Sequence, residues 1–237
     1  MNKRGFDIHD AKWFSRTEQL RLKQAKEEIE WLLDRNYPIL PVVKFVSDRY
    51  QFSNRQRDAL KRCVCTQLQK ESRISRRLSL SALNHQTIYI DGFNLIITLE
   101  VALSGGTLIR GRDEIIRDLA GLRGTYKLIE QTEEALRLIG QCLSSHHVNQ
   151  VIFYLDEPVS NSRNLKYKIL EFSKFWNFKT SVELVPNADL ALQHHSHIIS
   201  SDAIVLDSCL SYFNLSEDII QRFIPDAFIL TSVSYTH

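Results

Sequence analysis

The first 82 residues carry apolar side chains at helical spacing. Between residues 17 and 33 these positions recur every three or four residues, which predicts an amphipathic helix. Pro38 suits the first turn of a second helix that runs to about residue 49. The Ser53-Asn54 pair can cap a third helix that runs through residue 68. The pattern predicts a small all-helical domain followed by a linker, together residues 1–82.

From Thr87 onward, short apolar runs alternate with helical patterns. The runs are residues 87–90, 150–155, 181–185, 197–200 and 227–230. The helical patterns are residues 93–103, 113–122, 125–144, 163–176, 189–195 and 216–222. Apolar strands that alternate with helices indicate a parallel sheet with helices on both faces. Residues 83–237 are therefore expected to form an α/β domain.

The charge of the chain is divided unevenly along its length. Residues 1–82 hold 18 Lys and Arg against 10 Asp and Glu, and the remaining residues hold 12 against 18. A basic segment favours nucleic acid as a partner, although soluble helices are often basic for solubility alone. RNA is the expected partner and DNA, through a helix-turn-helix, the second. The candidate contacts are Arg49, Arg55, Arg57, Lys61 and Arg62.

The composition also indicates in which cellular compartment the protein is found. No apolar run approaches the roughly 20 residues that span a bilayer, and the N-terminus has no apolar signal segment. We therefore expect a cytoplasmic protein with no membrane partner. Its four cysteines are expected to be buried free thiols, as in a reducing compartment. Homo-oligomer formation stays open.

Aspartates follow the predicted strands where the chain leaves the sheet. Asp91, Asp156 and Asp202 come after the first, second and fourth runs, and Asp189 comes after the third. Parallel sheets bind ligands beyond the carboxyl ends of their strands. Clustered carboxylates repel one another unless a cation lies among them, and oxygen ligands favour Mg²⁺ or Mn²⁺. Each Asp also suits a helix N-cap or a turn, so this alternative stays open.

Two motifs around these aspartates resemble a known superfamily. Ile88-Tyr89-Ile90-Asp91-Gly92-Phe93-Asn94 resembles the D-G-x-N opening of NYN domains, a branch of the PIN-like nucleases. Ile199-Ser200-Ser201-Asp202 resembles the S-D element after the fourth strand of PIN-like domains. The similarity covers roughly residues 87–231. It implies a PIN-like fold in which Asp91, Asp156, Asp189 and Asp202 bind metal, with Asn94 and Ser201 in support.

A second set of residues, in the helical region, resembles another protein family. Val46-Ser47-Asp48-Arg49-Tyr50-Gln51, with Gln56-Arg57 and Ala59-Leu60, resembles the prokaryotic family named domain of unknown function 434. That name implies no activity.

Arg112 is a further candidate site residue. It lies in a glycine-rich basic loop, where its guanidinium could bind a phosphate.

These patterns favour a Mg²⁺- or Mn²⁺-dependent endoribonuclease. Asp91, Asp156 and Asp202 are the expected catalytic residues for phosphodiester hydrolysis, and the helical domain is expected to position RNA. Two alternatives remain. One is an inactive PIN-like module that binds nucleic acid or works in a complex, and the other is a DNA-binding regulator.

Overall fold

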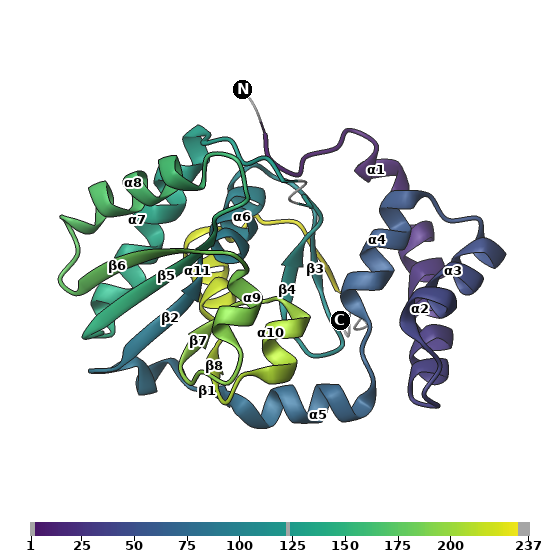
Figure 1. Ribbon diagram of the computed structural model, residues 1–237. Helices are drawn as coiled ribbons and strands as arrows, with labels where there is room; N and C mark the ends of the chain where they lie inside the picture. Colours follow the sequence, from purple (N-terminus) through teal and green to yellow (C-terminus); the bar gives the residue numbers. More distant parts are fainter. Residues whose placement is uncertain (1–2, 122–123, 232–237) are drawn as a thin grey trace.

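The chain begins with a helical region and continues into an α/β region (Figure 1). The computed structural model describes residues 3–121 and 124–231. The helices of the first region are α1 (Asp10–Trp13), α2 (Arg16–Leu33), α3 (Ile39–Tyr50), α4 (Asn54–Cys63) and α5 (Gln67–Arg76). The predicted helices over 17–33 and 38–49 are confirmed as α2 and α3.

The third predicted helix is two helices in the structure. Ser53 caps α4 through a reciprocal capping box with Gln56, as predicted for its start. The helix ends at Cys63, because Thr66 and Gln69 form a second capping box that starts α5. The predicted linker at the end of this region is also structured, since α5 extends to Arg76 and a short strand, β1 (Arg77–Leu78), follows.

The main sheet has six strands in the order β1-β8-β7-β2-β5-β6, and every pairing in it is parallel. The remaining strands of this sheet are β2 (Thr87–Asp91), β5 (Gln150–Asp156), β6 (Lys179–Val185), β7 (Ile198–Ile199) and β8 (Tyr212–Phe213). The predicted α/β fold with a parallel sheet is confirmed. The chain passes from β2 to β5 and β6 on one side, then returns to β7 on the other, so the order of strands reverses at β2.

Helices cover both faces of this sheet. The helices of the region are α6 (Gly92–Leu103), α7 (Glu130–Ser145), α8 (Ser162–Ser173), α9 (Ala188–Leu192), α10 (Ala203–Ser208) and α11 (Leu215–Phe223), and a 3-10 turn, η1 (Leu80–Leu83), precedes β2. Ile88 and Ile90 of β2 face the large core that includes α6, α7, α8 and α11. Tyr89, between them, faces the smaller core of α9 and α10. The two-residue alternation along β2 thus assigns each side chain to one face.

A second sheet corrects two expectations. It contains β3 (Leu108–Arg110), β4 (Ile116–Asp118) and β9 (Ile229–Thr231). The predicted helix over 113–122 is wrong. Residues 111–115 make a turn and β4 pairs antiparallel with β3, while the last predicted residue, Leu122, lies outside the described ranges. The predicted fifth strand exists as β9, but it pairs with β3 instead of joining the main sheet.

The helical region packs against this small sheet. Its core contains Val42, Val46 and Leu60 together with Ile109 of β3 and the nearby Leu119. Figure 1 shows α2, α3 and α4 side by side, with β3 and β4 between them and the main sheet. The boundary at residues 82 and 83 stays a prediction, and several contacts cross it.

The N-terminal segment also makes contacts across this boundary. Arg4 forms an ion pair with the buried Glu100 of α6 and donates to the carbonyl of Lys127 at 2.5 Å. Burial raises the pKa of Glu100, and the charge of Arg4 opposes that rise. The hydroxyls of Tyr126 and Thr132 also bind this carboxylate. Arg4 is thus bound to the α/β region by its side chain.

The structure can be compared with two expectations from composition, one on the cysteines and one on membrane-spanning helices. All four cysteines are buried free thiols, as predicted. Within residues 3–121 and 124–231, none of the helices has the length and apolar character needed to cross a membrane.

Candidate functional site

Four aspartates lie at the carboxyl-terminal edge of the main sheet, on both sides of the point where strand order reverses. Asp91 and Asp156 are the last residues of β2 and β5. Asp202 follows β7, and Asp189 lies in the first turn of α9, after β6. We call these four residues the acidic edge. The position is the one where parallel α/β sheets bind ligands.

The side chains at this edge also begin helices. Asp91 caps α6 by accepting from the backbone N–H of Asn94 at 3.2 Å. Asp202 caps α10 in the same way, accepting from Ile204 at 2.7 Å. Asp156 accepts from the backbone N–H of Ala188 at 2.8 Å, where α9 begins. The capping role that the sequence left open is therefore present. In each of these bonds one carboxylate oxygen is the acceptor.

A polar network joins the ends of β2 and β7. The hydroxyl of Ser200 donates to Oδ2 of Asp91 at 2.9 Å, and the backbone N–H of Asp202 donates to that hydroxyl at 3.0 Å. Oδ1 of Asn94 accepts from both the backbone N–H and the hydroxyl of Ser201, each at 2.8 Å. Asn94 and Ser201 therefore fix the two strand ends relative to one another.

Burial and mutual repulsion raise the pKa values of two of these carboxylates. Burial raises the pKa of Asp91 to about 7, the charges of Asp189 and Asp202 act in the same direction, and the bond from Ser200 opposes them. Burial also raises the pKa of Asp189 to about 6, with help from the charges of Asp202 and Asp156. The four carboxylates therefore interact electrostatically as one group.

The donor chemistry of the acidic edge suits a hard divalent cation. All four side chains offer carboxylate oxygens, which favour Mg²⁺ or Mn²⁺ over zinc. A cation among them would remove the repulsion that adds to the effect of burial on the pKa of Asp91. In the part of the chain that the structure describes, no three of these aspartates bring carboxylate oxygens within 4.8 Å of one another. Side-chain rotation would therefore have to accompany metal binding.

Arg112 has partners elsewhere. Its guanidinium binds Asp34 at 2.9 Å, lies 3.5 Å from Glu30, and donates to the carbonyl of Cys65 at 2.8 Å. Among the described residues it has no hydrogen bond or ion pair with the acidic edge. Arg112 therefore links the end of α2 to the loop before β4, and the fold does not bring this residue to the candidate site.

The basic residues predicted to contact nucleic acid are largely bound within the chain. Arg55 forms an ion pair with Asp10 at 2.8 Å and also donates to the carbonyls of Gly5 and Leu119. The other pairs are Arg49 with Glu28, Arg57 with Asp48 and Arg62 with Asp118. Lys61 is exposed. These contacts count against a dedicated nucleic-acid face on α3 and α4.

Sequence analysis did not select Ser200 or Arg117. Ser200 stands beside the quoted Ser201-Asp202 pair, and its place two residues after the inward-facing Ile198 would have assigned it to the face of Asp91. Arg117 is buried, donates to the carbonyl of Ser201 at 2.8 Å, and pairs with Asp113. It lies in a segment expected to be helical, so no local pattern pointed to it.

Comparisons with known proteins identify relatives of the chain. Residues 80–218 match the family described as "Domain of unknown function (DUF5616)", and residues 21–76 match "Protein of unknown function (DUF434)". The second match confirms the resemblance seen in the helical region. The chain is 32% identical over 191 residues to an uncharacterized protein of Methanocaldococcus jannaschii, which covers 80% of this chain and 90% of the relative. No solved structure matches the chain.

Proposed function

The chain belongs to the family described as domain of unknown function DUF5616, and from its acidic edge we propose that it is a divalent-metal-dependent ribonuclease. The observation that carries the proposal is the placement of carboxylates from separate strand ends at one edge, where burial raises the pKa of Asp91 to about 7 and the charges of Asp189 and Asp202 act in the same direction. Strongly shifted carboxyl groups of this kind are concentrated at functional sites.

The similarity to NYN and other PIN-like nucleases supports the same function. The residues that carry it, Asp91, Asn94 and Ser201-Asp202, are linked in the structure by the network around Ser200. Motifs separated by more than 100 residues thus meet at the carboxyl ends of β2 and β7. In this proposal Asp91, Asp156 and Asp202 hold Mg²⁺ or Mn²⁺, and Asp189 adds charge from α9.

Each residue of the edge then has a distinct part. A bound divalent ion would supply an activated water and stabilise charge on a phosphodiester. Ser200 orients the carboxylate of Asp91 through its hydroxyl, and Asn94 fixes the loop that carries Asp202. These positioning contacts keep the strand ends together while the carboxylates rotate.

Two tyrosines favour single-stranded RNA as the substrate. Tyr89 and Tyr154 precede Asp91 and Asp156 by two residues, so they lie on the same face of the sheet as those carboxylates. Their rings stack with centroids 6.3 Å apart, and His195 packs edge-on against both. One side of each ring packs against the core of α9 and α10, and both rings are only partly buried. Aromatic side chains beside a catalytic edge can stack unpaired bases, whereas paired bases are already stacked.

The test is a cleavage assay on unstructured RNA with Mn²⁺ or EDTA. The wild-type protein should cleave with Mn²⁺ and not with EDTA, and Asp91→Asn should lose at least about 100-fold in rate, since mutations of residues that stabilise a transition state commonly cost that much. Asp48→Asn, which removes an exposed carboxylate of α3, is the matched control and should cleave like wild type. Equal cleavage by wild type and Asp91→Asn would refute the proposal.

One observation favours a second candidate, an inactive module that binds RNA or a partner protein. The carboxylate oxygens of the acidic edge are not gathered within 4.8 Å in the described residues. Such a module would bind single-stranded RNA without cleaving it, with equal affinity in Mn²⁺ and EDTA. The same assay, read by gel shift as well as cleavage, separates the two.

A further inference from the structure

A second group of metal-binding side chains lies far along the chain from the acidic edge. Cys142 belongs to the last turn of α7, and His146 follows the end of that helix four residues later. This spacing places both side chains on one face of the helix. Asp218 faces them from the first turn of α11, which packs against α7. One potential ligand atom from each residue lies within 4.8 Å of the other two.

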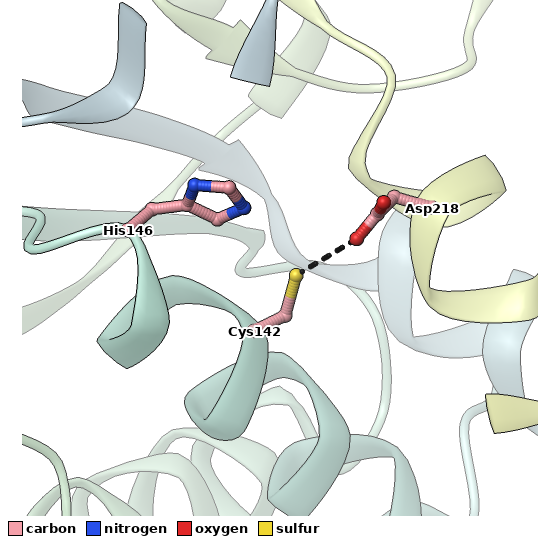
Figure 2. Close-up of side chains that lie close together, drawn as sticks. All are labelled: Cys142, His146 and Asp218. Atoms are coloured by element: carbon pink, nitrogen blue, oxygen red, sulfur yellow. Dashed lines mark hydrogen bonds between the residues drawn. The ribbon is translucent and has the colours of Figure 1, made fainter. Parts of the chain in front are cut away.

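The three side chains point into one shared space, as Figure 2 shows. The sulfur of Cys142 is fully buried and donates to Oδ2 of Asp218 at 3.2 Å. A ring nitrogen of His146 faces the same space. Its Nε2 is shielded from solvent and has no hydrogen-bond partner among the described residues. A buried polar atom without a hydrogen-bond partner lowers the stability of the folded protein by about 1–3 kcal/mol. A ligand on this nitrogen would remove that cost.

We propose that Cys142, His146 and Asp218 bind one transition-metal ion, with Zn²⁺ the best match. A sulfur, an imidazole nitrogen and a carboxylate oxygen are the three ligand types that zinc takes in proteins, whereas Mg²⁺ avoids sulfur. Tetrahedral zinc holds such donors about 3.5 Å apart, given bonds of about 2.0–2.3 Å. The ligand atoms lie within 4.8 Å of one another, so they must approach by about 1.3 Å at most.

The surroundings permit this rearrangement. His146 follows the last turn of its helix, where its ring can turn toward the sulfur without disturbing a continuing helix. Binding replaces the thiol proton of Cys142, which passes to solvent as the metal–sulfur bond forms. Arg222 donates to Oδ2 of Asp218 at 3.0 Å and to the sulfur of Cys142 at 3.8 Å. Its side chain is half-exposed, so it can turn away from the sulfur when the metal binds and stay hydrogen-bonded to the carboxylate. Three protein ligands leave one coordination position for water.

This site is independent of the ribonuclease proposal. It uses sulfur and nitrogen donors and joins α7 to α11, whereas the acidic edge uses oxygen donors at the strand ends. Zinc here would add metal–ligand bonds between two helices that otherwise meet through side-chain packing and the hydrogen bond from Cys142 to Asp218. It should therefore raise the thermal midpoint of the protein by mass action, because the unfolded chain lacks the assembled site.

The test is a titration with Co²⁺, which reports its own ligands by absorbance. It is carried out on Asp91→Asn, so that the acidic edge is weakened. We expect one equivalent to produce the near-ultraviolet band of a cobalt–thiolate bond together with the visible bands of a tetrahedral site. Zn²⁺ should then remove both, since zinc displaces cobalt from such sites. The absence of a thiolate band at saturation would overturn the proposal.

Variants identify the ligands. Cys142→Ser should abolish the thiolate band. His146→Ala and Asp218→Asn should each weaken Zn²⁺ binding, measured against a chromophoric chelator, by more than the roughly 10–100-fold that loss of an outer-shell residue costs. Cys209→Ser and His147→Ala are the controls, a buried cysteine elsewhere and the neighbouring exposed histidine.

The outcomes separate cleanly. Both controls should bind like the parent protein. An unchanged affinity in His146→Ala, whose partly exposed ring can be removed without opening the core, would refute the site even if Cys142→Ser fails to fold. Circular dichroism of each variant establishes that it is folded before its affinity is compared.

Discussion

Removing the charge of Asp91 should stabilise the metal-free protein at neutral and alkaline pH. The pKa of this carboxyl is about 7 in the folded chain, against an ordinary value of 3.8. A raised folded pKa means that the stabilising effect of protonation is complete below pH 3.8 and is lost as the pH rises through 7. The metal-free wild type should therefore become less stable between pH 4 and pH 8.

The size of the effect follows from the same numbers. A shift of about 3 units corresponds to about 4 kcal/mol at 1.36 kcal/mol per unit. Asp91→Asn removes this penalty but weakens the bonds from Ser200 and Asn94, at a cost of about 1–3 kcal/mol. The variant should gain roughly 1–3 kcal/mol at pH 8. In a chain of this length each kcal/mol moves the thermal midpoint by about 2–4 °C.

The assay is a series of melts in EDTA from pH 4 to pH 8, repeated with Mn²⁺. Wild type should lose stability with rising pH in EDTA and regain it with Mn²⁺, while Asp91→Asn should respond weakly to both. Asp48→Asn is the control, because its exposed ion pairs with Lys44 and Arg57 lower the pKa of that carboxyl, so losing the charge brings no gain. If Asp91→Asn melts well below wild type at pH 8 and Mn²⁺ moves neither midpoint, Asp91 is only a helix cap.

Three further predictions concern the surroundings of the site. Asp113→Asn should cost about 3–5 kcal/mol in urea unfolding, because it leaves the buried guanidinium groups of Arg73 and Arg117 short of a partner. Those partners hold the pKa of Asp113 at about 2, so wild type should lose this contribution between pH 4 and pH 2, which an acid titration followed by tryptophan fluorescence would detect. Gly92→Ala should cost about 1–3 kcal/mol in the same urea assay, since its Cβ would lie 2.5 Å from a methyl carbon of Leu155. Removing one stacking ring with Tyr154→Leu should weaken binding to single-stranded RNA by about 1–3 kcal/mol in a filter-binding assay and leave Mn²⁺ affinity unchanged, and an equal loss of both would contradict the stacking role.

The elements that a sequence predicts best are those whose own residues determine them. The strands β2 and β5 are continuous apolar runs, and the parallel sheet follows from their alternation with helices. The capping box at Ser53 likewise lies within four residues. The prediction of a helix over residues 113–122 was wrong for the opposite reason. Their extended form depends on pairing with β3 and on the buried carboxylate of Asp113, and neither is visible in a local pattern.

The candidate site divides along the same line. The aspartates and Asn94 could be predicted from the sequence because strand ends converge in any parallel sheet. The partners of charged side chains were not, since the basic pattern of α4 contains no sign that Arg55 would meet Asp10 or that Arg62 would meet Asp118. The group of Cys142, His146 and Asp218 was missed because its third member comes from a helix 72 residues further along than His146.

The ion pair between Arg4 and Glu100 has a consequence for how the chain matures on the ribosome. The N-terminal segment is made first, yet its partners in α6 and at Lys127 are made about a hundred residues later. It cannot finish docking until that part of the chain has emerged, while α2, α3 and α4 can already pack with their neighbours. A fragment that starts at residue 83 would lack the guanidinium and leave a buried carboxylate without its charge partner. The segment around Arg4 is therefore made first but docks only after residues 100 to 127 have been made.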